Sequence, residues 1–155
     1  MLRGIRFEIP NKIGTLLADM LQPIDITLYN WINQNEEAYF LTDGQIDKPL
    51  FLEGENGLDG NFLEKRIRDN LYYIIFADLK AFPKGEKVNN IDTYEEFLDS
   101  NCKLVLLVVD SVYSTIYCKD KEKIKLLYSN AIECSFKDVQ YITDDNDDRT
   151  GLSVW

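Results

Sequence analysis

The 155-residue sequence contains no histidine. Histidine is the side chain whose ordinary pKa lies nearest neutrality, and it is the commonest metal ligand in proteins. Its absence excludes Ser-His-Asp and Cys-His catalysis, and it excludes zinc or iron sites built on imidazole. The composition therefore favours a protein that is not an enzyme, without deciding the question.

Cysteine is scarce, with only Cys102, Cys118 and Cys134. An odd, sparse set fits a reducing compartment better than a disulfide framework. Three thiolates without histidine leave a zinc site one ligand short unless an Asp joins them, and the spacing matches no metal-binding pattern. Cys118, beside a lysine and just before a predicted helix, is the one candidate for an activated thiol. We expect ordinary buried cysteines and no cofactor.

The sequence also lacks a phosphate-binding glycine loop and any long apolar run. The segment 54–60, GENGLDG, matches neither the P-loop nor the dinucleotide fingerprint. No stretch approaches the roughly 18 to 20 apolar residues of a membrane-spanning helix, and the first residues lack the apolar stretch of a signal peptide. We expect a cytoplasmic protein that does not associate with membranes.

Negative charge, by contrast, is abundant. The chain has 27 Asp and Glu against 17 Lys and Arg, a formal charge of −10. Such a field repels nucleic-acid phosphates and anionic lipid, whereas it attracts basic partners. Two interpretations stay open, which are solubility alone and recognition of a basic protein.

Several stretches have the patterns of β-strands. Residues 2–9 alternate between apolar and polar, as in a half-buried strand, while 71–79 and 104–109 are apolar on both faces, as in central strands. Weaker strand signals at 26–31 and 38–41 predict a hairpin around a polar segment. Two further strands are expected at 113–118 and 138–143.

Four helices are expected between these strands. The first has its apolar stripe between Ile13 and Leu21 and ends before Pro23, and the second ends near Asp69. The expected capping residues are Asn11, Asp59, Asp92 or Thr93, and Asp120. Because hairpins interrupt the alternation of strands and helices, we predict an α+β fold with a mixed, mostly antiparallel sheet and about four helices packed on it. No linker divides the chain, so residues 1–155 are expected to form a single domain.

Four stretches resemble a family of small uncharacterised proteins of bacilli and related bacteria, a domain of unknown function. They are RGIRFEIPNK, YYIIFADLKAFPKG, CKLVLLVVDSVYSTIYCKD and YITDDNDDRTGLSVW. The resemblance spans nearly the whole chain. It implies a bacterial cytosolic protein and brings no functional residues with it.

Asp78 and Asp110 are the candidate catalytic residues. Each stands where an apolar run ends, so their carboxylates would meet at one sheet edge if the two strands were parallel neighbours. Paired carboxylates bind Mg²⁺ or divide acid and base roles. The alternative is that Asp110 forms a turn and that Asp78 pairs with Lys80.

The acidic tail holds a second candidate metal site. Asp144, Asn146 and Asp148 occupy the first, third and fifth positions of a calcium loop. The rest of the pattern fails, because Arg149 stands at the glycine position and Trp155 at that of the bidentate Glu. We expect at most weak surface binding of cations.

Aromatic residues supply the candidate interface. Trp31, Tyr39 and Trp155 would suit a protein contact, although filling the core is the default for Trp31. The first functional hypothesis is a non-enzymatic acidic module that binds another protein, in the manner of an immunity protein or antitoxin, or binds itself as a dimer. The second is a metal-dependent hydrolase or transferase that uses Asp78 and Asp110. A third possibility is a pocket for a small metabolite between the sheet and the helices, for which the sequence gives no signal.

Overall fold

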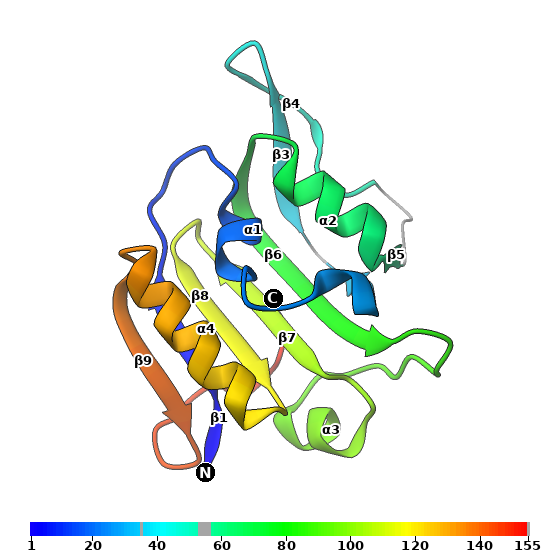
Figure 1. Ribbon diagram of the computed structural model, residues 1–155, viewed down its shortest axis with the longest axis vertical. Coiled ribbons are helices and arrows are strands. Elements are labelled where there is room, and N and C mark those ends of the chain that lie inside the picture. The colour runs from blue at the N-terminus through cyan, green and yellow to red at the C-terminus, as the bar shows by residue number, and fades with distance from the viewer. Residues whose placement is uncertain (35, 53–56, 155) are drawn as a thin grey trace.

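The computed structural model describes residues 1–34, 36–52 and 57–154 (Figure 1). The strands are β1 Leu2–Glu8, β2 Tyr29–Asn33, β3 Glu37–Thr42, β4 Gln45–Pro49, β5 Leu58–Asp59, β6 Tyr72–Pro83, β7 Leu104–Val109, β8 Tyr113–Cys118 and β9 Lys137–Thr143. The helices are α1 Leu16–Met20, α2 Gly60–Arg68, α3 Tyr94–Asp99 and α4 Lys121–Glu133, with a 3-10 helix η1 at Ile26–Leu28. Within the described ranges, no helix has the length and apolar character needed to cross a membrane.

The strands form one nine-stranded sheet with the order β4-β3-β6-β7-β8-β1-β9, to which β2 is added beside β6 and β5 beside β2. Every strand pair among the described residues is antiparallel. The predicted α+β class with a mostly antiparallel sheet is confirmed.

The predicted hairpin between β2 and β3 is wrong in its pairing. Both strands exist, but they lie end to end along the same edge of β6, whose twelve residues are long enough for both. Tyr29–Asn33 pairs with the second half of β6 and Glu37–Phe40 with the first half. The hairpin in this region is instead β3–β4, which turns at Asp43 and Gly44 with positive φ at both residues.

Apolar side chains cover both faces of the sheet. Helices α1, α2 and α4 lie on one face (Figure 1), where their buried side chains pack with those of β1, β6, β7 and β8. The other face packs against α3 and the C-terminal segment, through Phe82, Phe97, Leu107, Tyr117 and Leu152. The tail is therefore part of the core on that second face.

Three of the four predicted caps are confirmed. The side chains of Asp59, Thr93 and Asp120 accept backbone N–H bonds at the starts of α2, α3 and α4. Asn11 is the exception, because α1 begins only at Leu16. Residues 11–14 form a loop instead, since Gly14 and Tyr72 exchange two backbone hydrogen bonds of 3.1 Å.

Candidate functional site

Asp78 lies inside the protein, on β6. Its side chain is fully buried, and its Oδ1 accepts a hydrogen bond of 2.6 Å from the Lys80 ammonium two residues along the same strand. Burial raises the pKa of Asp78, and the adjacent ammonium opposes that rise. The interpretation of Asp78 as the partner of Lys80 is therefore confirmed.

Asp110 lies elsewhere, in the exposed turn between β7 and β8. Asp110 and Ser111 have φ values of 53° and 66°, which suit a tight hairpin turn. Because β6 and β7 are antiparallel, Asp78 stands opposite Leu107, three residues before Asp110. Three residues of strand separate positions by roughly 10 Å. The premise of parallel strands was wrong, and the two carboxylates do not converge.

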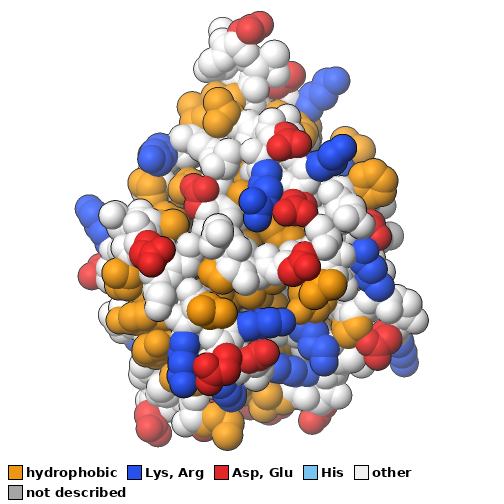
Figure 2. All heavy atoms as spheres, in the orientation of Figure 1, with side chains coloured by type: hydrophobic (Ala, Val, Ile, Leu, Met, Phe, Trp, Pro, Cys, Tyr) orange, Lys and Arg blue, Asp and Glu red, His pale blue; other side chains and the backbone are white. Residues whose placement is uncertain are grey.

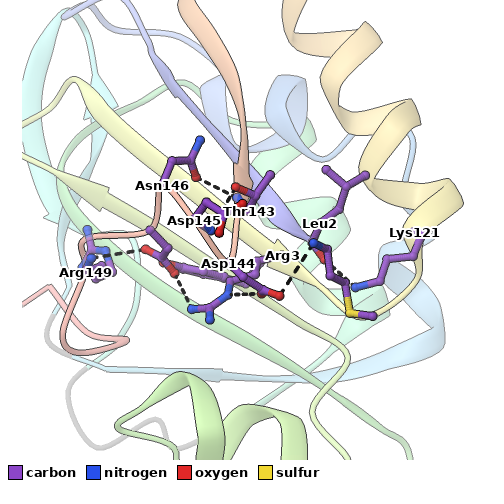
Figure 3. Close-up of polar contacts among 11 residues, drawn as sticks. Leu2, Arg3, Lys121, Thr143, Asp144, Asp145, Asn146 and Arg149 are labelled. Atoms are coloured by element: carbon purple, nitrogen blue, oxygen red, sulfur yellow. Dashed lines mark hydrogen bonds and ion pairs between the residues drawn. The ribbon is translucent and has the colours of Figure 1, made fainter.

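Two of the three tail residues, Asp144 and Asn146, form hydrogen bonds within the chain (Figure 3). Asp144 accepts a hydrogen bond from Arg3, and Asn146 bonds the backbone N–H of Thr143 and the carbonyl of Tyr141. Asp148 is exposed. Across the described part of the chain, no three His, Cys, Asp or Glu side chains are grouped so as to hold a metal ion. Asp144 and Asn146 thus hold the turn that follows β9.

The aromatic candidates do not form one patch. Trp31 is fully buried and donates from Nε1 to the carbonyl of Ile26 at 3.0 Å, so its assignment to an interface was wrong. Tyr39 is half-buried on β3. Trp155 lies outside the described residues.

The cysteines have no activating environment. Burial raises the pKa of the Cys102 thiol to about 11, and it also raises that of Cys118. Cys134 is exposed, and its pKa is likewise raised. Since a nucleophilic thiol needs a lowered pKa, the hypothesis of an activated Cys118 has no support in this geometry.

Acidic side chains of the tail gather with those of α3, a combination that no sequence pattern predicted. Residues 92–99 and 144–148 hold eight acidic residues and no basic one. Seven of these are exposed. We call them the acidic surface: Asp92, Glu95, Glu96, Asp99, Asp144, Asp145 and Asp148.

Arg3 joins the two segments of the acidic surface. Its guanidinium donates to Asp144 at 2.9 Å and to Asp147 at 3.1 Å (Figure 3), and its Cζ lies 4.0 Å from the centre of the Tyr94 ring on α3. The Tyr117 hydroxyl donates to Asp147 at 3.0 Å. The hydrogen bond from Arg3 holds the pKa of Asp144 below its ordinary value. These contacts fix the tail turn beside α3.

Much of this surface is left without counter-charge. Six of its seven residues, all except Asp144, form no ion pair with any described residue. Asp92 and Glu96 accept side-chain hydrogen bonds from Asn90 and Thr93. The other four carboxylates are those of Glu95, Asp99, Asp145 and Asp148. Leu98, on the same helix, is 51% exposed. Exposed carboxylates held on packed elements, with an apolar side chain among them, can bind the cationic side chains of another molecule.

The sequence identifies the two acidic segments but does not predict that they lie side by side. Counting charge along the chain reveals the two segments without a basic residue, but nothing local predicts that they meet. Their meeting depends on Arg3, which lies 141 residues before Asp144. Separations of that size are set by the sheet, through the pairing of β1 with β9.

Comparison with known proteins identifies relatives without assigning a role. A family model described as protein of unknown function (DUF2691) matches residues 2–153. The chain is 47% identical over 154 residues to the uncharacterized protein YncE of Bacillus subtilis (strain 168), which covers 99% of this chain and 100% of that protein. No solved structure matches.

Proposed function

The chain belongs to the family of proteins of unknown function described as DUF2691, and we propose that it acts as a non-enzymatic module that binds a basic segment of a partner protein. The acidic surface carries this proposal. Seven exposed carboxylates from two distant segments lie around α3 and the tail turn, and six of them have no ion pair among the described residues. We propose the cytoplasm as its location.

A basic partner fits this surface better than the other classes of macromolecule. Like charges that face one another cost several kcal/mol in an interface, so the surface disfavours nucleic acid and also disfavours its own copy. A Lys- or Arg-rich segment would be attracted over a distance of about 10 Å at ordinary salt and would dock faster for that reason. Dimerisation through this surface is correspondingly disfavoured.

The test is a fluorescence anisotropy titration of a labelled octalysine peptide with the full chain and two variants. The first variant, Glu95→Gln with Asp99→Asn and Asp145→Asn, removes three unpaired carboxylates from the acidic surface. The second, Asp43→Asn with Asp69→Asn and Glu133→Gln, removes three exposed carboxylates from other parts of the chain. Both variants have the same net charge, so any difference between them reports position rather than charge.

We expect the first variant to bind octalysine about tenfold more weakly than the unmodified chain, a loss of about 1.4 kcal/mol. The control should change by less than about twofold, and raised salt should reduce binding in every case. Equal losses in both variants would mean that the peptide responds only to the overall charge, which contradicts the proposal. Sedimentation of the same samples should give a monomer.

A further inference from the structure

A cavity of about 450 Å³ opens where β8 leads into α4. It lies on the side of the sheet that carries α4, and Figure 2 shows basic side chains gathered over the lower part of this face. Three lysines line it, Lys103, Lys119 and Lys123, with Asp120 and Tyr29 beside them. Basic residues therefore outnumber acidic ones around this cavity, although acidic residues outnumber basic ones in the chain as a whole.

None of the three lysines forms an ion pair among the described residues. The one carboxylate beside them, that of Asp120, is used at the start of α4, where it accepts the backbone N–H groups of Glu122 and Lys123. The three ammonium groups and the one carboxylate around the cavity therefore give a local formal charge of +2.

Two of the lysines are anchored with hydrogen-bonding capacity to spare. Lys119 donates from Nζ to the carbonyl of Ser100, and Lys123 donates from Nζ to the Tyr29 hydroxyl at 3.0 Å. An ammonium has three N–H donors, so each keeps others for a ligand, and the Tyr29 hydroxyl keeps its own hydrogen to donate. Burial lowers the pKa of Lys119, and the positive charge of Lys103 acts in the same direction. A bound anion would stabilise the charged ammonium and so raise this pKa again.

The rest of the lining is apolar. Ile24 and Leu104 are buried side chains that border the cavity, and Cys118 lies between the strands and α4. The volume falls within the roughly 300 to 1,000 Å³ of small-molecule sites, well above what one phosphate ion occupies. The lining therefore suits a ligand with an anionic head and an apolar body.

We propose that this cavity binds a small organic phosphate, with its phosphoryl group against Lys103 and Lys123 and its organic part against Ile24 and Leu104. A phosphate monoester carries close to two negative charges at neutral pH, which matches the local charge. Lysine binds phosphate as a point charge and needs no bidentate geometry. A polyanion such as nucleic acid is excluded, because the field of the whole chain repels it.

The test is isothermal titration calorimetry of the full chain with phenyl phosphate, inorganic phosphate and succinate. Phenyl phosphate is expected to bind at least about tenfold more tightly than either of the others, since it alone has both a phosphoryl group and an apolar body. Equal or tighter binding of succinate would assign the cavity to dicarboxylates and overturn the proposal. Tighter binding of a single-stranded oligothymidine would overturn it as well.

Matched lysine variants locate the binding. Lys103→Gln, at an exposed position, and Lys103→Gln with Lys123→Gln should weaken phenyl phosphate, the double variant by at least about tenfold. Lys48→Gln with Lys65→Gln, on β4 and α2, removes the same charge elsewhere and should leave the affinity within about twofold. Loss in the control, or no binding of phenyl phosphate at millimolar concentration, contradicts the proposal. The outcome can be told apart from that of the octalysine titration, because none of the lysines changed here belongs to the acidic surface. Lys119, whose pKa burial lowers and the charge of Asp99 on that surface raises, stays unchanged in every variant.

Discussion

At the scale of single residues, the buried ion pair Asp78–Lys80 is a costly polar feature of the core. Both side chains lie on β6 within the sheet, with relative exposures of 0% and 4%. Two charges removed from water lose hydration that their mutual attraction only partly restores, so such a pair adds little net stability. Removing one partner is a different matter, because it leaves the other charge buried alone.

Lys80→Met is therefore expected to destabilise the protein by about 3 to 5 kcal/mol. Asp78→Leu combined with Lys80→Met should recover that loss and give a protein at least as stable as the unmodified chain. The urea midpoint, converted to a free energy of unfolding, is the measurement. A small effect of Lys80→Met, below about 1 kcal/mol, would mean that Asp78 does not stay charged in the core.

Arg3 sets the titration of Asp144. The folded pKa of Asp144 lies below its ordinary value of 3.8, so its contribution to stability is complete above that pH and is lost as the pH falls through the folded pKa. Arg3→Gln removes the hydrogen-bonded guanidinium, and the pKa of Asp144 should rise toward its ordinary value. An NMR titration of the side-chain carboxyl carbons measures this directly.

Asp59 provides the internal control for that titration. Its pKa is also lowered, but chiefly by the backbone N–H of Asn61 at the start of α2. It should stay lowered in Arg3→Gln. If Asp144 keeps its low pKa in this variant, the hydrogen bond from Arg3 is not what lowers it.

At the scale of elements, the helix caps were predictable from the sequence, whereas the pairing of distant strands was not. Thr93 and Asp120 cap helices through bonds to residues two or three positions away, so the sequence pattern alone located them. The hairpin expected between β2 and β3 failed because a strand pattern identifies a strand and not its partner. Both strands pair with the same edge of the long strand β6. Nothing in the sequence of β2 or β3 predicts this pairing.

The short α1 has a similar cause. The apolar spacing from Ile13 onward is that of a helix, but pairing of Gly14 with Tyr72 holds the chain extended until Leu16. Ile13 consequently remains 46% exposed. The tertiary contact between Gly14 and Tyr72 thus overrode the local preference for helix, which is weak enough to be overridden in this way.

Strand β1 depends on a glycine where it meets β8. A Cβ placed on Gly4 would lie 1.9 Å from the carbonyl oxygen of Ile116, which is backbone and cannot move aside without disturbing the sheet. Gly4→Ala should cost at least about 3 kcal/mol of unfolding free energy, measured by urea denaturation.

Gly14→Ala is the matched control for that substitution. A Cβ there meets nothing nearer than 4.0 Å, at the Leu16 side chain. Its effect should stay within about 0.5 kcal/mol. Similar costs at both positions would mean that backbone entropy, rather than the contact of β1 with β8, decides the result.

At the scale of the whole molecule, charge is sorted into two regions. The acidic surface lies around α3 and the tail turn, while the lysine-lined cavity lies at the start of α4. Total charge was readable from the sequence, but its sorting was not. Arg3 meets Asp144 across 141 residues and Lys123 meets Tyr29 across 94, so each region exists only once the sheet has formed.

The most direct test of a partner-binding acidic surface is a residue-resolved one. Octalysine added to the ¹⁵N-labelled chain is followed by the backbone amide shifts. We predict that the largest changes fall in residues 92–99 and 144–148, where carboxylates without ion pairs come together. Changes spread equally over other exposed acidic positions, such as those of the β3–β4 hairpin and the end of α4, would contradict the account.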